Sequence, residues 1–69
     1  MDANYIINRL KSTIYKYPTV DLLRTRLNNI DESSRREIIV SLKMELWRER
    51  SSDIHEPLME LLYREPLAS

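Results

Sequence analysis

Apolar residues recur at intervals of three and four along almost the whole chain, and this spacing constrains the fold more than any other feature. An α-helix makes one turn in 3.6 residues, so residues at these intervals share one face of a helix. A half-buried strand would instead alternate at every second residue, and the chain has no Asn-Gly or Asp-Gly hairpin turn. The sequence therefore predicts an all-α protein.

Four segments follow this spacing, and we expect a helix in each of them: residues 3–16, 19–30, 32–50 and 54–65. Short connections favour antiparallel neighbours, so we predict a compact bundle of three to four short antiparallel helices. It would form a single domain over residues 1–69, with 66–69 as a frayed tail. The predicted core residues are Ala3, Ile6, Ile7, Leu10, Ile14, Tyr17, Val20, Leu23, Leu27, Ile30, Ile38, Ile39, Leu42, Leu46, Ile54, Leu58, Leu61 and Leu62.

Proline and capping residues set the expected helix boundaries. Pro18 should end the first helix, because its ring disfavours helical geometry in the preceding residue and it has no N–H to donate. The second helix then begins either with Thr19 as N-cap or with Pro18 in its first turn. Asp31 is the expected N-cap of the third helix, with Ser34 as an alternative start, and Asp53 is the expected N-cap of the fourth.

The composition excludes several classes of function. The chain has 69 residues, no cysteine and no glycine, so it has no disulfide and none of the glycine-dependent loops that cradle phosphate. The absence of cysteine fits a reducing compartment, and we expect the protein to be cytoplasmic. We expect no catalytic residue, cofactor or metal, and therefore no enzyme.

The charges cancel overall but are unevenly distributed. Eleven basic and eleven acidic side chains leave no net field to attract nucleic acid or an anionic membrane. Residues 1–30 carry five basic and two acidic side chains, giving +3, and residues 31–69 carry six and nine, giving −3. This asymmetry predicts either attraction between the two halves or a bipolar surface. No apolar run approaches the roughly 20 residues of a membrane span.

The third helix carries two apolar stripes where a small bundle needs only one. Its inner stripe suffices for the core, and a second, outer stripe is centred about 150° away around the helix axis. This outer stripe either packs against another helix or docks a second copy or another protein. We name Val40, Met44 and Trp47, with the adjacent Arg48, as candidate partner-binding residues, because Trp, Met and Arg are enriched in interfaces. The inner stripe comprises Ile38, Ile39, Leu42 and Leu46.

Two other groups of residues suggest different functions. An arginine cluster raises an alternative function as a small nucleic-acid-binding regulator, because Arg binds phosphate and guanine well. Glu32 and Glu37 in the first turns of the would-be recognition helix weigh against this alternative. His55 is the only histidine, and its neighbours are explained by helix capping, so we expect a structural or surface residue. The arginine cluster comprises Arg24, Arg26, Arg35 and Arg36.

The sequence thus favours a small protein–protein interaction module, acting as a regulator, adaptor or inhibitor through one helix face. Its partner would be another protein or a second copy in a homodimer. A bundle of 69 residues has little room for a catalytic pocket but can readily present a helix surface.

Overall fold

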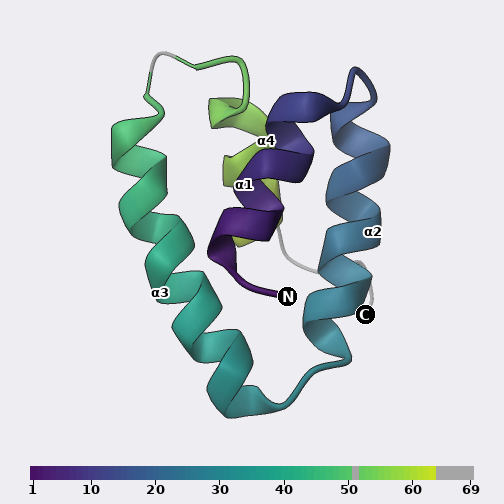
Figure 1. Ribbon diagram of the computed structural model, residues 1–69, viewed down its shortest axis with the longest axis vertical. Helices are drawn as coiled ribbons and strands as arrows, with labels where there is room; N and C mark the ends of the chain where they lie inside the picture. The colour runs from purple at the N-terminus through teal and green to yellow at the C-terminus, as the bar shows by residue number, and fades with distance from the viewer. Residues whose placement is uncertain (51, 64–69) are drawn as a thin grey trace.

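The structure, a computed structural model, describes residues 1–50 and 52–63 and contains four helices in that part of the chain (Figure 1). These are α1 (Ala3–Ser12), α2 (Lys16–Asn28), α3 (Glu32–Arg48) and α4 (His55–Tyr63). No strand occurs among the described residues, and successive helices run in opposite directions. The prediction of an all-α bundle is confirmed. None of these helices is both long and apolar enough to cross a membrane.

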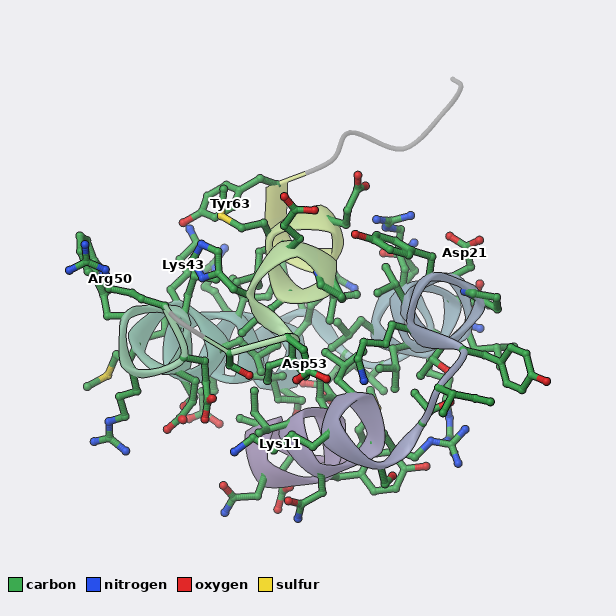
Figure 2. All side chains as sticks on the ribbon, turned by 90° about the horizontal axis from the view of Figure 1, so that it is seen from above. Lys11, Asp21, Lys43, Arg50, Asp53 and Tyr63 are labelled. Atoms are coloured by element: carbon green, nitrogen blue, oxygen red, sulfur yellow. The ribbon has the colours of Figure 1, made fainter. Side chains whose placement is uncertain are left out.

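Helices α2 and α3 form the two arms of a V, joined by a short turn at residues 29–31 (Figure 1). Helices α1 and α4 lie on opposite sides of this V, and each contacts both arms (Figure 2). Side chains from all four helices therefore meet in the space between α1 and α4. Helix α3 forms one edge of the molecule, so one of its sides faces away from every other helix.

The core consists of one cluster of buried aliphatic residues, and the sequence predicted all of its members. The four partly buried residues packed against it, Ala3, Ile30, Leu46 and Leu62, were predicted as well. Such a cluster is the main stabilising element of a chain without disulfides. Its buried members are Ile6, Ile7, Leu10, Val20, Leu23, Leu27, Ile38, Leu42, Ile54, Leu58 and Leu61.

The boundary between the first two helices lies earlier than Pro18, so the predicted range 3–16 for the first helix is wrong. Helix α1 ends at Ser12, and Pro18 is the third residue of α2. The first-turn N–H groups of a helix have no partner within it, so proline costs little there. Thr19 is not an N-cap; it is buried within α2, where its N–H and hydroxyl both donate to the Tyr15 carbonyl, at 3.2 and 2.7 Å.

This earlier boundary removes two residues from the predicted core. Ile14 lies in the break between the helices and is 84% exposed, and Tyr17 lies on the first turn of α2 and is half exposed. The apolar spacing places both in the core only if the helical rotation of α1 continues as far as Tyr17. Because the helix ends at Ser12, the 100° rotation per residue does not apply to them.

The starts of α3 and α4 depend on side-chain oxygens. Asp31 is the N-cap of α3, where its carboxylate accepts the Ser34 N–H at 2.9 Å, so the start at Asp31 is confirmed. This bond lowers the pKa of Asp31. Before α4, the Ser52 hydroxyl accepts the Ile54 N–H at 3.2 Å. Asp53 does not cap α4 as predicted; its carboxylate pairs with Lys16 at 3.4 Å.

Cationic side chains occupy the helix C-termini in place of glycine, the usual residue there. Lys16 Nζ donates to the carbonyls of Leu10 and Thr13 at the end of α1, at 2.9 and 2.7 Å. Arg35 donates to the Leu27 carbonyl at the end of α2 and to the Ile30 carbonyl in the turn after it, and Arg24 Nη2 donates at 2.7 Å to the Glu60 carbonyl in α4. The last carbonyls of a helix generally lack partners within it, and cations near them lie at the negative end of the helix dipole.

Among the described residues, two ion pairs join the basic N-terminal half to the acidic C-terminal half. Lys11 Nζ lies 2.8 Å from Glu49 Oε1, and Lys16 Nζ lies 3.4 Å from Asp53 Oδ2. The Lys11–Glu49 hydrogen bond raises the pKa of Lys11 and lowers that of Glu49. Attraction between the halves, one of the two expectations for the uneven charges, therefore occurs.

Helix α3 ends at Arg48, two residues before the predicted limit. Residues 64–69, which include the end of the predicted fourth helix and the predicted tail, lie outside the described part.

Candidate functional site

The outer stripe of α3 faces solvent. Val40 is 57% exposed, Met44 60% and Trp47 72%. By contrast, the eleven aliphatic residues of the core cluster are buried. Packing against a second helix, one of the two explanations for this stripe, is therefore wrong. Arg48 lies beside it and is also exposed, with its guanidinium 3.1 Å from Glu45.

The position of α3 at the edge of the V explains this exposure. Helix α1 covers one flank of α3 and helix α4 covers the other, and the inner stripe points between them. Ile38 and Leu42 are buried there, and Ile39 and Leu46 are half-buried. The outer stripe lies on the opposite side of the helix, where no element of the described chain reaches it.

A hollow beside Trp47 extends this apolar surface towards α4. It has a volume of about 290 Å³ and is lined by Leu46, Trp47, Arg50, His55 and Met59. The guanidinium of Arg50 lies over the Trp47 ring, 5.5 Å from its centroid. A cation in this position is attracted by the negative face of the indole.

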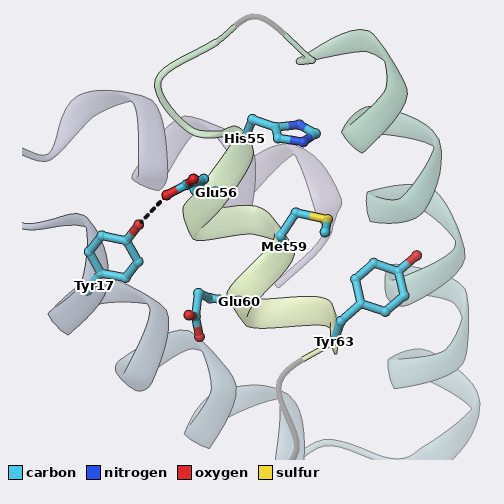
Figure 3. Close-up of a pocket in the computed structure, with 6 residues that line it drawn as sticks. All are labelled: Tyr17, His55, Glu56, Met59, Glu60 and Tyr63. Atoms are coloured by element: carbon cyan, nitrogen blue, oxygen red, sulfur yellow. Dashed lines mark hydrogen bonds between the residues drawn. The ribbon is translucent and has the colours of Figure 1, made fainter.

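Helix α4 presents two chemically different sides (Figure 3). His55, Met59 and Tyr63 point towards α3, whereas Glu56 and Glu60 point towards α2. Met59 and Tyr63 are 40% and 54% exposed, so they continue the apolar surface of the outer stripe.

A tyrosine of α2 meets the acidic side of α4. The Tyr17 hydroxyl donates to Glu56 at 3.4 Å. Partial burial raises the pKa of Tyr17, and the charge of Glu56 raises it further. The carboxylates of α4 are thus directed away from the hollow.

A lysine lies between the outer stripe and the apolar side of α4. Lys43 Nζ is 5.5 Å from the centroid of the Tyr63 ring, and the two side chains lie together in Figure 2. The sequence prediction of the partner-binding surface did not include Lys43, Met59 or Tyr63. Periodicity within α3 cannot find Met59 and Tyr63, because their place beside α3 depends on how α4 packs.

The four arginines proposed for nucleic-acid binding all make contacts within the chain. Arg24 and Arg35 are half-buried and donate to helix carbonyls. Arg26 donates to the Tyr5 hydroxyl at 3.0 Å and lies over its ring, and Arg36 pairs with Glu32 at 3.0 Å. Two of the four are therefore engaged by backbone carbonyls of the bundle.

His55 is half-buried at the start of α4, and its Nδ1 is buried without a hydrogen-bond partner in the structure. A metal would need further ligands around it. Among the described residues, no three His, Cys, Asp or Glu side chains gather closely enough to hold a metal ion.

Comparisons with models of protein families, with curated proteins and with solved structures found no match to this chain. Arguments about its function therefore start from its own residues and their geometry.

Proposed function

We propose that this protein is a non-enzymatic protein–protein interaction module, a small regulator, adaptor or inhibitor, that binds its partner through the outer stripe of α3. The observation that carries the proposal is the exposure of Val40, Met44 and Trp47 on one side of one helix. Contiguous exposed apolar surface is unfavourable in water unless a partner covers it, and helix faces of this kind dock into other proteins. We further propose a cytoplasmic location, since the chain contains no cysteine.

The shape and chemistry of the surface support binding rather than catalysis. Trp47 and Met44 offer large apolar area, and Arg48 adds a charged border of the kind found at the rims of interfaces. The nucleic-acid alternative has less support, because Arg24 and Arg35 already donate to backbone carbonyls and have fewer donors left for phosphate.

Site-specific photo-cross-linking in the producing cells tests this proposal. A photo-reactive amino acid such as p-benzoylphenylalanine replaces Met44 in one variant and Leu22 in another. Leu22 is a matched control, because it is also 60% exposed but lies on α2, away from the outer stripe. We expect a discrete adduct from position 44 and none from position 22.

The adduct should disappear when Val40→Gln and Trp47→Gln are added to the cross-linking variant at position 44. Equal labelling from both positions, or no adduct from position 44, would contradict the proposal. The mass of the adduct also distinguishes a second copy of this chain from a different protein. Sedimentation of the purified protein at two concentrations gives an independent measure of self-association.

A further inference from the structure

Basic side chains form a row along the α4-facing border of the outer stripe. Arg36 and Lys43 are spaced seven residues apart, which is close to two helical turns, so they share one side of α3, and Arg50 follows two residues after the end of that helix. Lys43 and Arg50 both lie on the side of the molecule where α3 meets α4 (Figure 2).

Two of these cations have no acidic partner among the described residues. Arg36 pairs with Glu32. Lys43 and Arg50 instead lie over aromatic rings, and neither forms an ion pair with another residue in the described part of the chain. Glu56 follows His55 on α4. Its carboxylate points towards α2 and accepts a hydrogen bond from the Tyr17 hydroxyl (Figure 3). Lys43 and Arg50 are therefore available to a carboxylate from outside the chain.

The hollow beside Trp47 lies within this positively charged border. Leu46 and Met59 give it apolar walls, and Arg50 lies at its edge. An apolar side chain of a partner can enter the hollow while neighbouring carboxylates reach the cations. Amphipathic helices combine these two features, because residues three and four positions apart share a face and those beside them form its flanks.

The same row of cations opposes pairing with a second copy. If two α3 helices met antiparallel about a twofold axis, the same flank of each helix would face the other. Lys43 would then oppose Lys43 of the second copy, and Arg36 would lie near Arg50. Like charges placed together across an interface are destabilising.

This inference rests on the proposed function: we propose that the outer stripe and the adjoining hollow bind another protein through an amphipathic helix with an acidic flank. An apolar side chain of that helix occupies the hollow beside Trp47, and carboxylates on its flank pair with Lys43 and Arg50.

Two synthetic helical peptides test this proposal with Trp47 as the reporter, since it is the only tryptophan of the chain. Both peptides have 17 residues, the length of α3, and the same leucine face. One carries glutamate on its flank and the other lysine at the same positions. Trp47 is 72% exposed, so docking should shift its emission to shorter wavelength. We expect the acidic peptide to bind about tenfold more tightly than the basic one, with a difference that falls as salt rises.

Charge reversal provides the matched control. Lys43→Glu with Arg50→Glu should reverse the preference between the two peptides. Arg26→Glu, which changes an exposed cation on α2, should leave the preference unchanged. A reversal by Arg26→Glu alone would show a general charge effect and overturn the inference.

The remaining outcomes separate this inference from the proposed function. Equal binding of both peptides, lost on Trp47→Ala when followed by calorimetry, would overturn the acidic partner but retain the docking surface. Binding of neither peptide would overturn the inference, and the cross-linking experiment would then decide the proposed function. Concentration-dependent dimerisation that Met44→Gln abolishes would also overturn it, because a second copy would cover the surface.

Discussion

The inner and outer stripes of α3 contain similar residues in opposite surroundings. Leu42 is fully buried among residues of the other helices, whereas Met44, two positions later, is 60% exposed. Both are large and apolar, and both lie on the same turn of one helix. The difference shows that apolar periodicity identifies the faces of a helix, but the packing of neighbouring helices decides which face is core. It also gives the two stripes separate roles that substitutions can test.

The largest expected effect comes from the inner stripe. Leu42→Ala should lower the free energy of unfolding by about 3 kcal/mol, since it removes buried contacts and leaves a cavity. That is a large part of the stability of a domain this small. The measurement is urea unfolding followed by circular dichroism, with Val40→Ala as the control on the same helix. Equal losses for the two variants would contradict the separation of the stripes.

A smaller loss should follow from a change at the junction of α1 and α2. Lys16→Met keeps the apolar stem but removes the ammonium that caps α1 and pairs with Asp53, and should cost about 1.5 kcal/mol. Cross-linking from position 44 should persist in this variant under conditions where it remains folded. Loss of the adduct from the fully folded variant would show that binding by the outer stripe depends on the contacts of Lys16. It would contradict the separate roles of the two stripes.

Most of the fold was predictable from the sequence because the apolar spacing records which face of each helix is buried. Every member of the core cluster in the described part of the chain was identified in this way. The end of α1 was not, because proline is compatible with both the end of a helix and its first turn, and the contacts of Thr13, Lys16 and Thr19 that decide between them are not visible in periodicity.

The candidate site was predictable only in part. Val40, Met44 and Trp47 could be separated from the inner stripe by their angle around the helix axis. The hollow could not be predicted, because Met59 and His55 reach it from α4, and their positions depend on the packing of α4 beside α3. Sequence spacing within one helix carries no information about such a contact.

The ion pair between Lys11 and Glu49, at the C-terminal end of α3, predicts a pH dependence. The Lys11 hydrogen bond lowers the pKa of Glu49 below its ordinary value of 4.5, so the folded state favours the carboxylate. This contribution is present above pH 4.5 and is lost as pH falls through the lower, folded-state pKa. Asp31 acts in the same direction from its ordinary value of 3.8.

The urea midpoint should therefore decrease as the solution is acidified below pH 4.5, and Glu49→Gln should make this decrease smaller. The raised pKa of Lys11 has the opposite dependence: its contribution is present below its ordinary value of 10.5 and is lost as pH rises above it. An identical acid dependence in Glu49→Gln and the unaltered protein would show that this pair does not contribute.

The smallest expected effect on stability comes from replacing the outer stripe as a whole. Val40→Gln, Met44→Gln and Trp47→Gln together should change the free energy of unfolding by no more than about 0.5 kcal/mol. Glutamine forms helices well, and the three substitutions remove only solvent-exposed interactions, among them the cation–π interaction of Arg50 with Trp47. Circular dichroism in urea measures the change without needing tryptophan.

A destabilisation comparable to that of Leu42→Ala would mean that the outer stripe is part of the core. If stability is retained and the adduct at position 44 disappears in the companion cross-linking variant, then binding, and not folding, accounts for these three apolar residues.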